Sequence, residues 1–164
     1  MTKLLLVDDE KIIRDSVGQS LMLAGFEVET FADARAALAK LQADFDGLLI
    51  TDIRMPEMDG LELMEKAHQL DADLPVILIS GHADVALAVN AIREGAYDLL
   101  EKPFAASELV ESVKRALEKR RLTLENRALK AELAEQQTRL GPRIMGQAPS
   151  IVALRKMIAR IANV

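Results

Sequence analysis

The 164-residue sequence contains no cysteine and only two histidines. Without cysteine the chain cannot form a disulfide or a thiolate metal site, and two isolated histidines are too few for a zinc cluster. No hydrophobic run approaches the roughly 18 residues that a membrane-spanning helix needs. The N-terminal sequence "MTKLLLVDDEK" reaches acidic residues too early for a signal peptide. We therefore expect a soluble, cytoplasmic protein.

The chain also lacks an excess of positive charge. It has 21 Lys and Arg against 26 Asp and Glu, which gives a formal net charge of -5. Binding to nucleic acid needs a concentrated basic surface, so this balance argues against such a site in these residues. Half of the residues are hydrophobic, and the length suffices for one domain of roughly 100–150 residues and an appendage.

Short hydrophobic runs alternate with segments whose apolar residues recur three and four positions apart. The runs at 4–7, 27–31, 47–51, 76–79 and 97–100 predict strands, and the segments between them have the period of a helix. This alternation is typical of parallel strands joined by right-handed crossovers, with helices on both faces of the sheet. We therefore predict a doubly wound α/β domain with a five-stranded parallel sheet over residues 1–120.

Charged and polar residues stand where the predicted strands end. Asp8 and Asp9 follow the first strand, Asp52 the third, Ser80 the fourth and Lys102 the fifth. In a doubly wound sheet the ligand-binding crevice lies at the carboxyl ends of the strands. We expect these five side chains to converge there.

Three converging carboxylates repel one another, by about 4 kcal/mol for each pair at ~4 Å and an effective dielectric constant near 20. A Mg²⁺ ion would offset this repulsion, because it binds oxygen ligands and needs only one or two carboxylates beside water and phosphate oxygens. Lys102 would add a fixed positive charge. With that charge neutralised, Asp52 could attack phosphorus to form an acyl phosphate, and the Ser80 hydroxyl could bond a phosphoryl oxygen.

Four segments carry a family resemblance. In order and spacing, "LLLVDDE", "ITDIRMPEMDG", "ISGHAD" and "GAYDLLEKPF" resemble the signature segments of receiver domains of two-component response regulators. The resemblance covers about residues 3–120 and implies the flavodoxin-like form of the fold. It also implies a sensor histidine kinase as the phosphoryl donor, and a signalling domain that catalyses only its own phosphoryl transfer and hydrolysis.

The resemblance assigns roles to single residues. Asp52 would be the phosphoacceptor, Ser80 the switch hydroxyl and Lys102 the contact of the phosphoryl group, with a cis bond to Pro103. The implied Mg²⁺ ligands are the acids and one main-chain carbonyl: Asp8, Asp9, Asp52 and the carbonyl of Arg54. Family members often have an aromatic residue three positions before the lysine. Here that position is Leu99, whose aliphatic side chain cannot perform the usual ring rotation.

Other functions are compatible with the same fold. A flavin carrier would need a hydroxyl-rich loop after the first strand and aromatic residues, whereas this chain has "DDE" there and 3% aromatics. A phosphatase of the haloacid dehalogenase type would need an acid two residues after the nucleophile, where Arg54 stands. A receiver-like dimerising scaffold that no longer accepts phosphate is the remaining alternative.

The segment 105–140 contains no proline or glycine and is rich in Ala, Leu, Glu, Lys and Arg, which predicts a long continuous helix. A seam with the spacing of a coiled coil follows the domain: Leu122, Asn126, Leu129, Leu133, Gln136 and Leu140. We predict a linker over 121–141 that pairs in parallel with a second copy, and the alternative is a solvated helix that only links two domains. The basic residues 119–121 are expected to be solvated.

A second dimer contact is expected on the fourth helix. Its inward stripe is predicted to be Val85, Ala88, Val89 and Ile92. The apolar residues off that stripe, Leu87 and Ala91, would then form a second face for a partner.

Residues 142–164 resemble the opening of the ATPase domain of sigma-54-dependent activators. A "G-Q-x-P" turn at 146–149 precedes an amphipathic segment with Ile151, Leu154, Ile158 and Ile161. No G-x-x-x-x-G-K-[S/T] loop occurs, so these residues do not predict ATP hydrolysis. We expect the full protein to continue into an ATPase and a DNA-binding module, through which it would contact sigma-54 RNA polymerase and DNA. Within this group, the whole sequence, including the stretches 96–110 and 118–130, is most similar to regulators of C4-dicarboxylate transport.

Overall fold

The computed structural model describes the backbone of residues 2–81 and 85–144, and side chains as far as residue 137. Two units divide the chain after Leu124, and each is described by itself. Among the described residues, no helix is both long and hydrophobic enough to cross a lipid bilayer. The prediction for residues 145–164 and the side chain of Leu140 lie outside the described residues.

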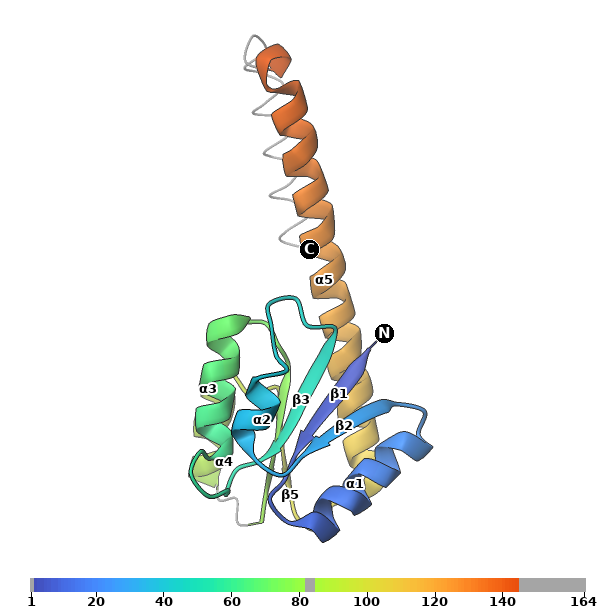
Figure 1. The fold of residues 1–164 in the computed structure, drawn as a ribbon, viewed down its shortest axis with the longest axis vertical. Helices are drawn as coiled ribbons and strands as arrows, with labels where there is room; N and C mark the ends of the chain where they lie inside the picture. The colour runs from blue at the N-terminus through green and yellow to red at the C-terminus, as the bar shows by residue number, and fades with distance from the viewer. Residues whose placement is uncertain (1, 82–84, 145–164) are drawn as a thin grey trace. The chain divides into compact units, whose positions relative to one another are not determined.

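The first unit is a five-stranded parallel sheet with helices on both faces (Figure 1). The strand order is β2-β1-β3-β4-β5, so the winding reverses between β1 and β3. The predicted fold is confirmed, and each predicted strand lies within one residue of its observed bounds. The elements are β1 (Lys3–Val7), α1 (Lys11–Leu23), β2 (Glu27–Phe31), α2 (Ala34–Leu38), β3 (Gly47–Asp52), α3 (Gly60–Leu70), β4 (Val76–Ser80), α4 (Val85–Arg93), β5 (Asp98–Glu101) and α5 (Ala106–Ile144).

Two hydrophobic clusters hold the layers together. Residues of the central strands point alternately to the two faces, which is why β1, β3 and β4 are nearly uninterrupted runs of aliphatic residues. Leu5, Leu49 and Leu78 pack beneath α2, α3 and α4, and Leu6 and Ile50 pack beneath α1 and the first turns of α5. Helices therefore cover both faces of the sheet. The carboxyl ends of the strands are left accessible, and a functional site can form there.

Two acids fix where helices begin. The Asp33 carboxylate accepts the Ala36 N–H at 2.9 Å, and the Asp59 carboxylate accepts the Glu62 N–H at 2.8 Å. These bonds satisfy main-chain donors that the first helical turn leaves free. The cap at Asp59 starts α3 directly after the loop that follows Asp52, and so helps to fix that loop.

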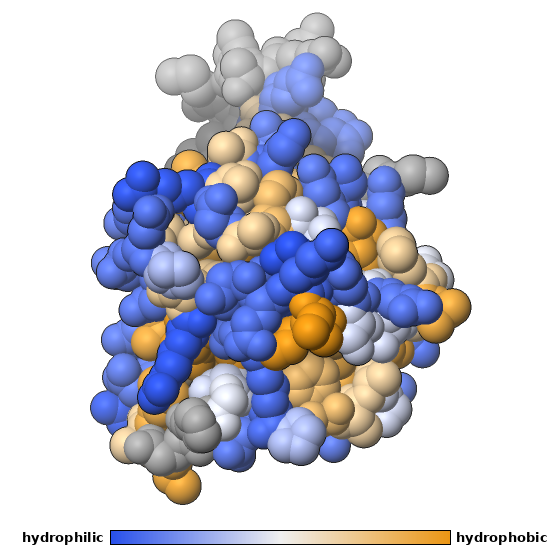
Figure 2. Space-filling view, turned by 60° about the horizontal axis from the view of Figure 1, so that its bottom comes forward, coloured by the Kyte–Doolittle hydropathy of each residue, from blue (hydrophilic) through white to orange (hydrophobic). Residues whose placement is uncertain are grey.

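The orientation of α4 differs from the prediction. Ala91 is fully buried and Leu87 packs against the core, whereas Val85, Val89 and Ile92 are 80%, 51% and 48% exposed. Both stripes are apolar, so the periodicity alone cannot tell which one faces the sheet; packing places leucine and the small alanine inward. On the face that Figure 2 turns toward the viewer, hydrophobic residues lie in patches among hydrophilic ones.

The helix α5 continues through the predicted linker. It ends at Ile144, beyond the predicted end of the linker at residue 141, and includes Gly141 and Pro142. A proline withholds its own N–H from the helix but does not prevent neighbouring residues from keeping helical dihedral angles. Three leucines of the predicted seam are exposed: Leu122 (52%), Leu129 (60%) and Leu133 (37%).

A buried arginine follows the row of buried hydrophobic residues on α5. Arg120 was expected to be solvated, but it is 1% exposed and follows Leu109, Val113 and Ala116 on the buried side of the helix. Its Nη2 donates to the Asp71 carboxylate at 2.7 Å and its Nε donates to the Phe45 carbonyl at 3.0 Å. The arginine thereby ties α5 to the loops that precede β3 and β4.

Asp71 is the partner that makes this burial favourable. Besides Arg120, its carboxylate accepts the N–H groups of Asp44 and Asp73, each at 3.0 Å. A buried charge is tolerated only when it is paired and hydrogen-bonded, and both conditions hold for this carboxylate. Removing the arginine alone would leave the negative charge buried without its ion-pair partner.

We predict that Arg120→Ala lowers the free energy of unfolding by about 3–5 kcal/mol, the usual effect of breaking a buried ion pair from one side. Urea unfolding followed by circular dichroism measures the change. Arg121→Ala is the matched control, since Arg121 is exposed and pairs on the surface with Glu118. Equal losses in the two variants would contradict a structural role for the buried pair.

Candidate functional site

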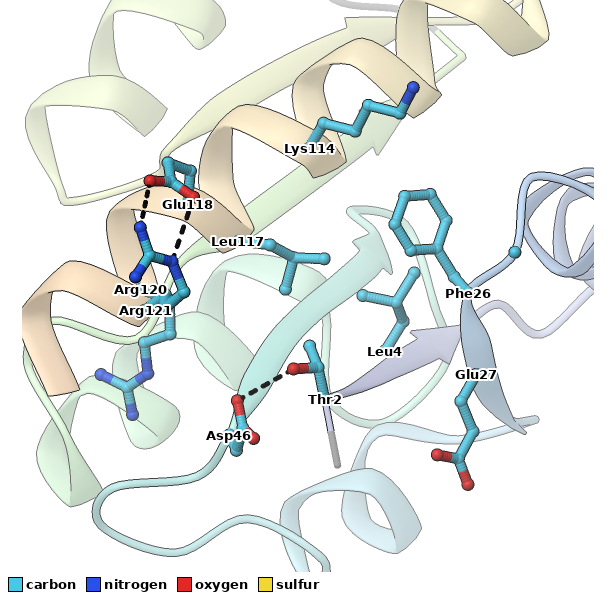
Figure 3. Close-up of a pocket in the computed structure, with 11 residues that line it drawn as sticks. Thr2, Leu4, Phe26, Glu27, Asp46, Lys114, Leu117, Glu118, Arg120 and Arg121 are labelled. Carbon is cyan, nitrogen blue, oxygen red and sulfur yellow. Dashed lines mark hydrogen bonds and ion pairs between the residues drawn. The ribbon is translucent and has the colours of Figure 1, made fainter. Parts of the chain in front are cut away.

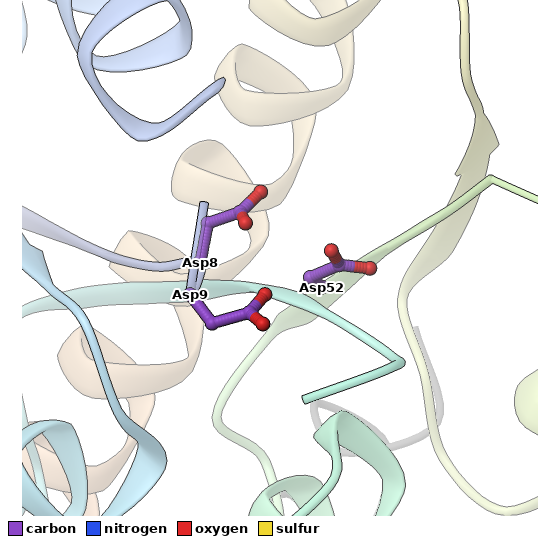
Figure 4. Close-up of side chains that lie close together, drawn as sticks. All are labelled: Asp8, Asp9 and Asp52. Carbon is purple, nitrogen blue, oxygen red and sulfur yellow. The ribbon is translucent and has the colours of Figure 1, made fainter. Parts of the chain in front are cut away.

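Three carboxylates meet at the carboxyl ends of β1 and β3. Asp8 and Asp9 follow β1 directly, and Asp52 is the last residue of β3. One oxygen of each lies within 4.8 Å of the others (Figure 4). The register explains this, because Val7 of β1 lies opposite Thr51 of β3, so the next residues of both strands emerge side by side. Asp8 and Asp52 are 1% and 5% exposed, while Asp9 is open to solvent.

A lysine from the end of β5 completes the pocket. The Lys102 Nζ lies 3.1 Å from the Asp52 carboxylate and 3.7 Å from that of Asp8. Its main-chain N–H donates to the carbonyl of Ser80 at 2.8 Å, which sets the buried serine at the same edge of the sheet. The Lys102-Pro103 peptide bond is cis, as predicted from the family resemblance.

The pocket shifts the pKa values of two of its groups. The pKa of Asp8 is raised, mainly by burial and further by the negative charges of Asp52 and Asp9. The hydrogen bond from the Glu10 N–H and the charge of Lys102 lower this pKa but do not cancel the increase. Burial alone would lower the pKa of Lys102, but its hydrogen bond to Asp52 and the charges of Asp52 and Asp8 raise it instead. The lysine therefore stays protonated at neutral pH, and the raised pKa of Asp8 means that this carboxylate is favoured when a proton or a cation neutralises it.

The acidic group fits a hard divalent cation. Carboxylate oxygens are the ligands that Mg²⁺ takes, and three of them are close enough to share one ion. Arg54 stands two residues beyond Asp52 with its side chain exposed, so its main chain passes the same end of β3. Leu99, at the position where the family often has an aromatic residue, is partly buried against the core on the α4 side of the sheet.

Two residues that the sequence reasoning missed shape the pocket. Gly60 packs so closely that a Cβ atom there would lie 2.2 Å from the Asp52 carbonyl oxygen, and its N–H donates to the carbonyl of Ile53 at 2.8 Å. Only glycine fits this contact. Arg14 of α1 donates from Nη1 to the carbonyl of Asp8 at 2.7 Å. The sequence signal for Gly60 was its position directly after the helix-capping acid Asp59. Hydrophobic periodicity gave no signal for Arg14.

A surface hollow at the opposite edge of the sheet has a different character (Figure 3). It is lined where strands begin, by Thr2, Leu4 and Glu27 among others, and basic and acidic side chains occur together in it. Thr2 donates to the Asp46 carboxylate at 3.2 Å. The mixed charges select neither an anion nor a cation, so the acidic pocket remains the candidate site.

Comparisons with known proteins agree with the geometry. The family model described as "Response regulator receiver domain" matches residues 4–114. The C4-dicarboxylate transport transcriptional regulatory protein DctD of Rhizobium meliloti (strain 1021) is 51% identical over 160 residues, 96% of this chain and 34% of that protein. The protein of the same name from Pseudomonas aeruginosa PAO1 is 48% identical over 163 residues, 99% of this chain and 35% of that protein. This chain thus spans about a third of the length of these relatives.

A solved structure supports the same assignment. The solution structure of the beryllofluoride-activated NtrC4 receiver domain dimer has a TM-score of 0.65 and 33% identity, covering 73% of this chain and 99% of that one. The similarity to response regulator receivers expected from the sequence motifs is confirmed, and so is the similarity to regulators of C4-dicarboxylate transport.

We predict that Asp8→Asn raises the free energy of unfolding of the metal-free protein at pH 7. The folded state raises the pKa of Asp8, so ionised Asp8 opposes folding above that pKa, and its penalty disappears as the pH falls toward its unfolded value of about 3.9. The gain should therefore be largest at pH 7 and shrink near pH 4, as measured by urea unfolding in EDTA. A loss of stability at pH 7 would contradict the electrostatic account of the pocket.

Proposed function

Because the chain belongs to the family of response regulator receiver domains, we propose that it accepts a phosphoryl group on Asp52 from a sensor histidine kinase. The observation that carries the proposal is the contact of the buried Asp52 carboxylate with Lys102 at 3.1 Å, beside two further acids. We propose a receiver over 1–120, a linker helix over 121–141 and the start of an ATPase domain over 142–164. The division of the chain after Leu124 is compatible with the first of these boundaries.

The positions of three side chains support the proposed phosphoryl transfer. An Asp52 carboxylate oxygen attacks phosphorus, the new O–P bond forms, and the P–N bond to the donor histidine breaks with its electron pair left on the imidazole. The protonated Lys102, which already contacts Asp52, offsets negative charge on the phosphoryl oxygens. Ser80, held at the same edge by the Lys102 N–H, supplies a hydroxyl to one of those oxygens.

The metal that suits this site is Mg²⁺. The proposed ligands are oxygens of the acidic group and one main-chain carbonyl, namely Asp8, Asp9, Asp52 and the carbonyl of Arg54. When bound, Mg²⁺ supplies positive charge to the phosphoryl oxygens. The proximity of the three carboxylates and the hard oxygen donors support this assignment.

The signal would leave the pocket through β4 and β5. Phosphorylation adds about -1.5 to -2 charges at the sheet edge, toward which Ser80 and Lys102 close. Ser80 pairs in register with Glu101, and Leu99 packs on the α4 side of β5 together with Leu87. We propose that these aliphatic contacts shift α4 and β5 between two packings. A change from 1:99 to 99:1 requires about 5.5 kcal/mol, within reach of several charge-assisted hydrogen bonds.

The proposed output is a change of dimer arrangement. The exposed seam of α5 supports pairing of linker helices through Leu122, Leu129 and Leu133, with Asn126 and Leu140 in the same register. On the receiver, the apolar surface available to a second copy is formed by Val85, Val89 and Ile92, because Leu87 and Ala91 pack inward. One solved structure similar to this chain, that of the beryllofluoride-activated NtrC4 receiver domain, is described as a dimer.

The longer protein is proposed to be a cytoplasmic transcriptional activator. Its relatives are named as C4-dicarboxylate transport regulators, and this chain spans about a third of their length. The receiver would restrain or release a downstream ATPase that acts on sigma-54 RNA polymerase and DNA. Apart from transfer to its own aspartate and the later hydrolysis, the receiver would catalyse no reaction.

We expect acetyl phosphate with Mg²⁺ to add one phosphoryl group to the purified chain, and Asp52→Asn to abolish the addition. Intact mass spectrometry measures both. Asp46→Asn is the matched control, because Asp46 is an exposed acid at the opposite edge of the sheet. An unchanged mass in the wild-type protein would favour the alternative function, a dimerising scaffold that does not depend on phosphorylation.

We also expect beryllofluoride with Mg²⁺ to change the dimer, as seen by small-angle scattering.

Leu129→Lys should weaken dimerisation at least tenfold by analytical ultracentrifugation, because it places a charge in the seam. Ala131→Lys, on an exposed residue outside the seam, should not. An identical scattering profile with and without beryllofluoride would argue against switching, and equal effects of the two lysines would argue against the seam.

A further inference from the structure

Arg14 approaches the acidic pocket from α1. It lies in the first turn of that helix, where its main-chain N–H donates to the carbonyl of Glu10 at 2.9 Å. Its side chain is partly buried, and Nη1 donates to the main-chain carbonyl of Asp8 at 2.7 Å. A hydrogen bond from a guanidinium is stronger than one between neutral groups, so this contact is able to fix the carbonyl that accepts it.

The other polar groups of Asp8 are also bonded. Its main-chain N–H donates to the carbonyl of Phe31 at 3.1 Å, and its carboxylate accepts the Glu10 N–H at 2.9 Å. The first bond holds the strand end and the second holds the side chain. The carbonyl, which belongs to the peptide unit shared with Asp9, is held by Arg14.

That peptide unit influences where the Asp9 carboxylate points relative to the other two acids. A peptide bond is planar, so the direction of the Asp8 carbonyl also sets the direction in which the chain enters Asp9. Rotation of the unit would turn the Asp9 carboxylate relative to those of Asp8 and Asp52. In the observed orientation, one oxygen of each of the three carboxylates lies within 4.8 Å of the others.

Arg14 acts on the backbone and leaves the acids available. Within residues 2–81 and 85–137, no ion pair joins Arg14 to a carboxylate, while Lys102 pairs with both Asp8 and Asp52. An arginine that paired with these acids would compete with a metal ion for them. Because Arg14 binds a main-chain carbonyl instead, it orders the acidic loop, and its guanidinium N–H groups do not occupy the carboxylate oxygens.

We propose that Arg14 is a positioning residue for the magnesium site, which holds the peptide unit between Asp8 and Asp9 in the orientation that metal binding and phosphoryl transfer require. This inference rests on the proposed function of the pocket. Partners in the shell around a metal site typically change metal affinity by about 10–100-fold when they are removed, and Arg14 has such a place.

The test compares three variants of the full chain. Arg14→Met has a similar length without N–H donors, Arg14→Lys keeps the charge and one donor group, and Lys11→Met removes an exposed positive charge from the same end of α1. Isothermal titration calorimetry measures Mg²⁺ affinity directly. Intact mass gives the rate of phosphorylation by acetyl phosphate over a range of Mg²⁺ concentrations, and thermal unfolding in EDTA reports folding.

We expect Arg14→Met to weaken Mg²⁺ binding by about 10–100-fold. The phosphorylation rate at saturating Mg²⁺ should fall by a smaller factor, because added metal restores the loop. Arg14→Lys should lie between wild type and Arg14→Met, and Lys11→Met should stay within about twofold of wild type. If Arg14→Met does not fold, Arg14→Lys serves as the test instead. A Mg²⁺ affinity below that of wild type would support the inference, and an unchanged affinity would overturn it.

Unchanged Mg²⁺ affinity in a folded Arg14→Met variant, with normal phosphorylation of the wild type, would overturn this inference alone. Equal weakening by Lys11→Met would overturn it too, because the effect would then be one of charge and not of position. A wild-type chain that neither binds Mg²⁺ nor gains a phosphoryl group would instead overturn the proposed function, and this inference with it.

Discussion

The repulsion among three carboxylates at the end of one sheet is the constraint on which this site depends. Asp8 and Asp52 are buried at the ends of adjacent strands, so neither can reduce the repulsion by turning into water. Lys102 offsets part of it through contacts at 3.1 and 3.7 Å, and the remaining deficit of positive charge makes the pocket receptive to a cation.

The packing of the fold holds the three acids together despite their mutual repulsion. Both faces of the sheet are covered by helices, and the glycine at the start of α3 lets the loop after Asp52 close against β3 without a side chain between them. At the far end of the sheet, Arg120 and Asp71 tie α5 to the loops before β3 and β4. Arg120 thus helps to fix the start of β3, the strand that ends in Asp52.

Much of this could be predicted from the sequence. Parallel strands with both faces buried appear as aliphatic runs, and residues that follow such runs must meet at one edge, so Asp8, Asp9, Asp52 and Lys102 were readable as one group. Periodicity failed where two answers were equally apolar, as on α4, where Ala91 turned out to face the core. It also failed for Arg120 and Arg14, whose partners are a distant acid and main-chain carbonyls that no pattern of side chains reveals.

The most direct test of the central claim is a titration of the metal-free chain with Mg²⁺, followed by amide NMR. The account predicts that the largest shifts occur at the residues flanking Asp8, Asp9 and Asp52, with smaller shifts at the end of β5 around Lys102. Shifts confined to other parts of the molecule, or no saturable shifts at millimolar Mg²⁺, would contradict the claim that the acidic pocket is built to take a cation.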